Sequence, residues 1–171
     1  DALDRPDASR DAGVPSKWPT PDPNLTPTKR EPLKGARAII AERLTLSASA
    51  IPHIHLTIQV DMSEAARLRE RVNPVLEKTS GLKASYTAII ARAVAYLLPR
   101  HPYLNSSLVD NEIVLWEEVN LGIAANQGAN LVVPVIRNTH AMTLEKIVQE
   151  MARLLDLTQK LKLPPADMKG S

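Results

Sequence analysis

Two adjoining segments near the middle of the chain carry the clearest hydrophobic pattern. Residues 119–126 alternate apolar with polar or small side chains, and a period of two predicts a β-strand. Its apolar face consists of Val119, Leu121, Ile123 and Ala125. Residues 131–136 are continuously apolar, as in a strand covered on both faces. Residues 127–130 between them include Gly128 and Asn130, which tolerate positive φ, so we expect an antiparallel hairpin in the middle of a sheet.

Residues 53–61 alternate in the same way and predict a further strand. Its core face would hold Ile54, Leu56, Ile58 and Val60. His53 and His55 share the opposite face, and a pair at this spacing is a possible zinc site. Because the sequence supplies neither a third ligand nor supporting hydrogen bonds, no metal is expected. Two shorter strands, at about 104–109 and 112–116, would meet at Asp110 and Asn111.

Four segments have the periodicity of amphipathic helices. The first begins at Leu33, and the second follows a cap at Asp61 or Ser63. The third follows Ser85, a natural N-cap, and is apolar almost all round except for Arg92, so it should be the most buried helix. The fourth runs from about residue 143 to 161, with Thr143 as its cap. Strands and helices together predict an α/β fold with mostly antiparallel neighbours.

Composition narrows the possible functions. A chain of 171 residues with 44% hydrophobic content suits one domain with a real core. The absence of Cys excludes disulfides and thiolate catalysis. A net charge of +2 and only 3% aromatic residues argue against a nucleic-acid groove, and no apolar run reaches the length of a membrane span. Residues 1–32 hold seven of the fourteen prolines and are interpreted as a linker, in which Trp18 is incidental or docks on a neighbouring subunit.

Five motifs between residues 32 and 171 resemble the catalytic core of the dihydrolipoamide acyltransferases, the central components of 2-oxoacid dehydrogenase complexes. Residues 119–124 resemble a Val-Asn-x-Gly-Ile-Ala strand, and residues 130–136 resemble Gly-Leu-x-Val-Pro-Val-Ile with Asn130 in place of the Gly. Residues 67–70 resemble Lys-Leu-Arg-Glu, residues 83–86 resemble Lys-x-Ser-Phe, and residues 101–107 resemble His-Pro-x-Leu-Asn-Ala-Ser. The resemblance implies residues 1–32 as an interdomain linker and residues 33–171 as an incomplete catalytic core.

This resemblance implies a coenzyme A site. It places coenzyme A contacts at Arg69, Ser85 and Asn126, the last replacing a family Asp. The alternatives from the residues alone are a solvated Arg row for Arg69 and simple helix capping for Ser85. Leu155 occupies a position where some members have Gln, which puts a polar contact there in doubt.

The implied reaction moves an acyl group between dihydrolipoamide, carried on a separate lipoyl domain, and coenzyme A. A thiol of pKa near 8.5 needs a general base, and the tetrahedral intermediate needs an oxyanion donor. The family supplies these from a His-x-x-x-Asp-Gly motif and from a Ser in Thr-Phe-Thr-x-Ser-Asn, and neither motif occurs in these residues. We therefore expect no catalytic residue in this chain, which would stop before the motif.

The resemblance also implies a fold and an assembly. The fold would be that of chloramphenicol acetyltransferase, a mixed, largely antiparallel sheet flanked by helices. Trimers with active sites between subunits would build a hollow cage and bind the decarboxylase and dihydrolipoamide dehydrogenase components, in the cytoplasm or the mitochondrial matrix. Two alternatives remain open: a free-standing enzyme of the chloramphenicol acetyltransferase type, against which the Pro-rich lead-in argues, and a non-catalytic assembly module.

Overall fold

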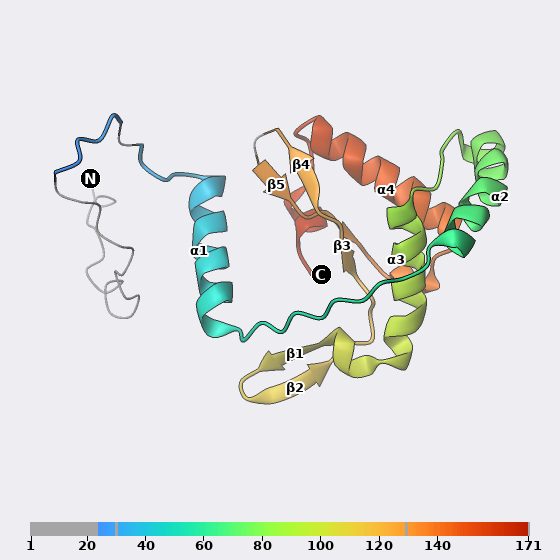
Figure 1. The fold of residues 1–171 in the computed structure, drawn as a ribbon, viewed down its shortest axis with the longest axis horizontal. Coiled ribbons are helices and arrows are strands. Elements are labelled where there is room, and N and C mark those ends of the chain that lie inside the picture. The colour runs from blue at the N-terminus through green and yellow to red at the C-terminus, as the bar shows by residue number, and fades with distance from the viewer. Residues whose placement is uncertain (1–23, 30, 129, 171) are drawn as a thin grey trace. The chain divides into compact units, whose positions relative to one another are not determined.

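The computed structural model describes residues 24–29, 31–128 and 130–170, and it divides the chain into two compact units, Asp1–His53 and Ile54–Ser171 (Figure 1). In the first unit, residues 24–29 and 31–34 contain no helix or strand. Helix α1 (Ala36–Ala50) follows Gly35, whose φ of 60° suits a residue without Cβ. The helix predicted from Leu33 is thus present but starts later. Most of the proposed linker, with Trp18, lies outside the described residues.

Three helices organise the second unit: α2 (Ser63–Ser80), α3 (Tyr86–Leu97) and α4 (Leu144–Gln159) (Figure 1). Both predicted N-caps of α3 and α4 are confirmed, because Ser85 accepts a hydrogen bond from the Ala88 amide and Thr143 accepts one from the Lys146 amide. At the start of α2, the Asp61 carboxylate accepts from the Ser63 amide at 2.8 Å. Hydrogen bonds from the Ser63 side chain and backbone hold the pKa of Asp61 below its usual value.

The core of this unit lies where the three helices meet the strand that ends at Ile136. Helix α4 contributes four of the core's nine buried side chains, more than any other element, and small residues of α3 let the helices approach closely. Its buried members are Leu76, Ala84, Ala88, Ala91, Ile136, Ile147, Val148, Met151 and Leu154. Short 3₁₀ helices complete the connections: η2 (Leu98–Arg100), η3 (Pro102–Asn105), η4 (Thr139–Ala141) and η5 (Pro165–Met168).

The predicted central hairpin is confirmed, although it is interrupted midway. Strands β3 (Leu121–Gly122) and β6 (Val135–Ile136) pair at one end, and β4 (Ala125–Gln127) and β5 (Asn130–Val132) pair at the other. Between them, the Ile123 amide donates to the Pro134 carbonyl, so the antiparallel register continues through the break. Pro134 has no amide to donate in return, which explains the interruption. Gly128 turns with φ of 61°, as expected.

The second hairpin also forms where the sequence predicts it. Strands β1 (Ser106–Val109) and β2 (Glu112–Leu115) pair antiparallel across a two-residue turn. Asp110 and Asn111 have φ of 47° and 67°, the left-handed conformation that this type of turn needs at both positions. Among the described residues, all three sheets are two-stranded and antiparallel, so the α/β class holds while the single larger sheet that we predicted is not formed.

Three predictions of burial fail in whole or in part. Residues 53–61 form no strand, and Leu56 is 93% exposed, because no described strand lies alongside to pair with them. Helix α3 is not the most buried helix: it buries Ala88, Ala91 and Ala95 and exposes its larger side chains on another face. The continuously apolar residues 131–136 are buried only from Pro134 to Ile136, whereas Leu131 and Val133 are exposed. In the described residues, no helix is both long and apolar enough to cross a membrane.

Candidate functional site

Two side chains of α2 hold the residue that leads into α3. The Arg69 Nε donates to the Ala84 carbonyl at 3.1 Å, and the Asn73 Oδ1 accepts from the Ala84 amide at 2.8 Å. Residues 69 and 73 are four apart, so they lie on one side of the helix. Ala84 is only 1% exposed, and α2 therefore satisfies both polar backbone groups of a buried residue. This clamp fixes the position of the next residue, Ser85.

Ser85 presents the N-terminus of α3. Its extended backbone (φ −86°, ψ 164°) ends the incoming chain, and its Oγ accepts from the Ala88 amide at 3.1 Å. The amides of Tyr86 and Thr87 belong to the first helical turn and have no partner within the helix. Such free amides, together with the helix dipole, favour an anion at this position.

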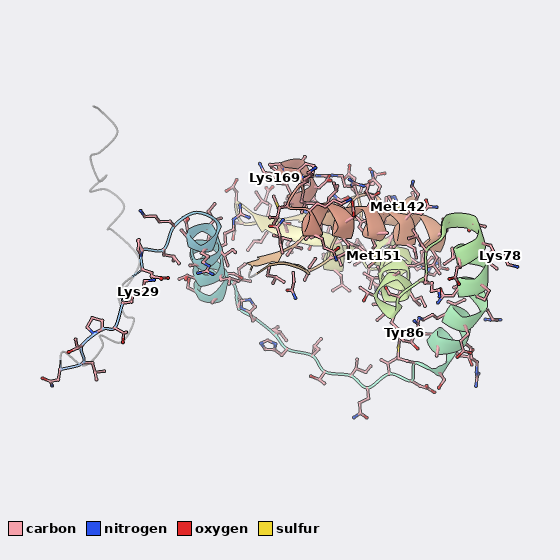
Figure 2. The ribbon with its side chains drawn as sticks, turned by 90° about the horizontal axis from the view of Figure 1, so that it is seen from above. Lys29, Lys78, Tyr86, Met142, Met151 and Lys169 are labelled. Carbon is pink, nitrogen blue, oxygen red and sulfur yellow. The ribbon has the colours of Figure 1, made fainter. Side chains whose placement is uncertain are left out.

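The Arg69 guanidinium lies beside the same helix end. Its Cζ is 4.9 Å from the centroid of the Tyr86 ring, and Tyr86 is seen between α3 and α2 in Figure 2. Arg69 is half-buried, and in the described part of the chain only its Nε is bonded. The remaining donors keep the planar geometry that binds phosphate or carboxylate in a bidentate manner. Arg69 and the start of α3 thus offer neighbouring donors to one anion.

An apolar cavity of about 150 Å³ adjoins Ser85. Val148, Met151 and Leu155 of α4 form part of its wall, and Lys83 lines it from the segment before α3. The Lys83 Nζ also lies 3.1 Å from the Glu77 carboxylate, in an exposed ion pair. Leu155 is 39% exposed and offers this cavity a hydrocarbon surface with no polar group.

Asn126 lies on a different element from Arg69 and Ser85. It is exposed in β4, opposite Leu131 of β5, and in the described residues it forms no hydrogen bond with Arg69 or Ser85. Its neighbour Gln127 ties the strand to α4, because the Gln127 Nε2 donates to the Thr158 carbonyl at 3.3 Å. The structure therefore brings Arg69 and Ser85 together but does not join Asn126 to them.

None of the four histidines lines the cavity beside Ser85. All four are exposed, and the His101 carbonyl accepts from the Leu104 amide in a 3₁₀ turn, in keeping with a structural role. Within the described ranges, no group of three or more His, Cys, Asp or Glu side chains is placed to hold a metal ion.

A larger cavity, about 570 Å³, lies between η3, β1 and the segment after β2. Several of its polar groups are already bonded to one another: the Asn105 Nδ2 donates to the Trp116 and Glu118 carbonyls, and the Trp116 Nε1 donates to the Ser107 Oγ. Because these groups stabilise the surrounding loops, we assign no functional site to this cavity.

Asn73 and Lys83 are site residues that the sequence reasoning missed. Asn73 follows Arg69 by four residues, and this spacing on a helix is a signal that could have paired them. Lys83 lies within the motif that led to Ser85, and its position beside the cavity appears only in three dimensions.

Solved structures share this arrangement of helices and hairpins. A probable dihydrolipoamide acetyltransferase from Listeria monocytogenes superposes with a TM-score of 0.79 and 33% identity, over 84% of this chain and 61% of that one. The cubic core of the pyruvate dehydrogenase multienzyme complex gives the same TM-score at 28% identity, over 88% of this chain and 65% of that one. The second unit therefore has the fold of an acyltransferase core.

Sequence comparison specifies the family. The chain belongs to the 2-oxoacid dehydrogenases acyltransferase (catalytic domain) family, whose model matches residues 26–171. It is 36% identical over 142 residues to the dihydrolipoyllysine-residue acetyltransferase component of the pyruvate dehydrogenase complex of Caenorhabditis elegans, covering 81% of this chain and 28% of that protein. It is 34% identical over 134 residues to a dihydrolipoyllysine-residue succinyltransferase component of Bartonella vinsonii, covering 78% of this chain and 33% of that protein. The chain thus spans about a third of the length of these relatives.

Proposed function

We propose that this chain forms the coenzyme A-binding part of an acyltransferase core, which exchanges an acyl group between a dihydrolipoyl group and coenzyme A. The observation that carries the proposal is the clamp on Ala84, which places the Arg69 guanidinium beside the free first-turn amides of α3. Coenzyme A carries phosphate groups, and a guanidinium next to a helix N-terminus supplies hydrogen-bond donors and positive charge for them. The apolar cavity beside Ser85 suits a neighbouring less polar part of the ligand.

Family membership supports the reaction class, and the relatives' names support the substrate class. Acetyl- and succinyltransferases both appear among the relatives, so the acyl group differs within the family. In this proposal Asn126 of β4 is an additional, uncharged contact for coenzyme A, and it touches a different part of the ligand from Arg69 and Ser85. The lipoyl group would be carried on a separate domain, and no metal takes part.

The proposal extends to assembly. A structure with the same fold comes from the cubic core of a multienzyme complex, which supports a structural role beside catalysis. We propose a homotrimer of the chloramphenicol acetyltransferase type as the building unit, with the decarboxylase and dihydrolipoamide dehydrogenase components as partners in the complete protein. Residues 1–32 would serve as the Pro-rich interdomain linker that precedes the core.

The test measures coenzyme A binding by calorimetry in the wild-type chain and in Arg69→Ala. Losing a charge-assisted hydrogen bond of this kind weakens binding by about 1.5–3 kcal/mol, or roughly 10- to 150-fold. Pantetheine, which lacks the nucleotide phosphates, should bind both proteins equally.

Two controls separate charge from positioning. Arg71→Ala removes the same charge from an exposed position on the same helix and should leave the affinity unchanged. Asn73→Ala removes the other half of the Ala84 clamp without changing the charge. If Asn73→Ala weakens binding as much as Arg69→Ala does, Arg69 acts only by positioning Ser85. Unchanged affinity in Arg69→Ala would exclude this end of α3 as the coenzyme A site.

A further inference from the structure

Arg92 is the one charged residue in the sequence of α3, and its guanidinium has an unsatisfied buried group. The Nη1 atom is buried and has no hydrogen-bond partner in the described part of the chain. A buried guanidinium nitrogen without a partner destabilises the structure, since it has lost water without gaining a replacement. A hydrogen-bond acceptor that reached this nitrogen would remove this destabilisation.

A cavity of about 280 Å³ adjoins Arg92. Three helices contribute to its wall, which is hydrocarbon apart from Arg92 and the Tyr96 ring. Its lining residues are Leu68, Ile89, Arg92, Ala93, Tyr96 and Leu144. The volume corresponds to roughly nine water molecules at liquid density, enough for a short branched aliphatic chain.

The surroundings of Arg92 carry positive charge without a matching acid. The Arg92 Cζ lies 5.9 Å from the centroid of the Tyr96 ring, and the Arg100 Cζ lies 3.8 Å from the same centroid. Arg100 also donates from Nη2 to the Tyr96 hydroxyl at 2.6 Å. Among the described residues, neither arginine forms an ion pair with a carboxylate, so two cations share one aromatic ring. The two guanidinium groups therefore favour the binding of an anion.

We propose that the Arg92 cavity binds a carboxylate that is attached to a short aliphatic body. A carboxylate is planar and monoanionic, so one guanidinium can neutralise it and bind both oxygens. A phosphate dianion would lose more hydration than a carboxylate on entering a cavity lined by Leu68, Ile89 and Leu144. The aliphatic body would cover these side chains. This site is separate from the proposed coenzyme A site and does not depend on it.

The experiment uses methyl-labelled wild-type chain and follows the Leu68, Ile89 and Leu144 methyl signals by NMR. The probes are 4-methylpentanoate, which is ionised at pH 7, and 4-methylpentanamide, which has nearly the same shape without the charge. The lining methyl signals should shift with both probes, and the carboxylate should saturate at a concentration about tenfold lower or more.

Variants identify the group responsible. Arg92→Gln should abolish the preference for the carboxylate, and Arg92→Lys should keep part of it, because lysine retains the charge but not the planar fork. Arg71→Gln removes a charge from an exposed position on α2 and should keep the full preference. If Arg92→Gln does not fold, the wild-type comparison of acid with amide and the Arg92→Lys variant still decide the matter.

The carboxylate can come from a free acid or from an Asp or Glu side chain of a polypeptide. The peptides acetyl-Leu-Glu-Leu-amide and acetyl-Leu-Gln-Leu-amide distinguish these sources. Saturation by the Glu peptide at a lower concentration than by 4-methylpentanoate would assign the site to a polypeptide, and the reverse order would assign it to a small acid. Equal binding of acid and amide to the wild-type chain, or lining methyl signals that do not shift with the acid, would overturn the proposal.

Discussion

Ser85 has two roles in this account, and one pair of substitutions separates them. It caps α3 through its bond to the Ala88 amide, and it borders the proposed phosphate position. Ser85→Ala removes the oxygen and with it the cap. Ser85→Asp replaces it with another good capping oxygen but adds a negative charge where the phosphate would lie.

The structure sets the size of the stability effect. Loss of an N-cap costs about 0.5–2 kcal/mol in general. Ala88 is only 1% exposed, so water has poor access to the amide that Ser85→Ala leaves unbonded, and a value of about 1.5–2 kcal/mol is expected. In urea denaturation followed by circular dichroism, this corresponds to a fall of roughly 0.5–2 M in the midpoint with an unchanged slope. Ser85→Asp should stay within about 0.5 kcal/mol of the wild-type protein.

Coenzyme A binding should respond in the opposite order. Two like charges about 4 Å apart near a protein surface repel by up to roughly 4 kcal/mol, and partial exposure reduces this value. Ser85→Asp should therefore weaken coenzyme A binding at least about tenfold, and more strongly than Ser85→Ala does. Equal destabilisation by both substitutions would refute the capping role. Wild-type affinity in Ser85→Asp would move the phosphate site away from α3.

Three further predictions concern turnover, assembly and pH. The 171-residue chain should not exchange thioesters between acetyl-coenzyme A and dihydrolipoamide, because neither catalytic motif occurs in its sequence. A general base is worth about 10²–10⁴-fold and an oxyanion donor about 10²–10³-fold, and robust turnover would show that one of the four histidines is the base. Light scattering should find a trimer or a multiple of it, and monomer alone at high concentration would contradict assembly through residues 33–163. The pKa of Asp61 is lowered in the folded state, so its carboxylate stabilises the fold above the unfolded value of about 3.8, and this stabilisation is lost as the pH falls. Between about pH 3 and 7, the urea midpoint of Asp61→Asn should therefore fall less in acid than that of the wild-type chain.

Features that depend on neighbouring residues could be predicted from the sequence. Ser85 and Thr143 cap their helices because a side-chain oxygen at that position reaches an amide three residues later. Asp110 and Asn111 form their turn because both residue types adopt positive φ at low cost. In each case, all the interacting groups lie within a few residues, so the pattern alone carries the information.

Only part of the candidate site could be predicted from the sequence. Arg69 and Ser85 were named by resemblance, and nothing in their spacing shows that they meet beside Ala84. The contact depends on the angle at which α2 packs against the start of α3, which is a property of the whole unit. The bond of Asn73 to Ala84 and the unsatisfied Arg92 nitrogen could not be predicted from the sequence either. Each depends on which residues of other elements lie nearby in the folded chain.

Burial failed as a prediction for a different physical reason. An apolar pattern shows which face of a helix or strand tends to be buried. It does not show which other segment or subunit packs against that face. Ile90, Val94 and Leu97 lie three and four residues apart and form an exposed stripe on α3, and Ile54, Leu56 and Ile58 form an exposed row at strand spacing. Exposed apolar rows and unpaired strand segments favour association. One solved relative comes from the cubic core of a multienzyme complex, and we propose a second copy of this chain as the cover for both surfaces. Charged substitutions at Leu56 or Val94 should therefore affect assembly before they affect the fold of the second unit.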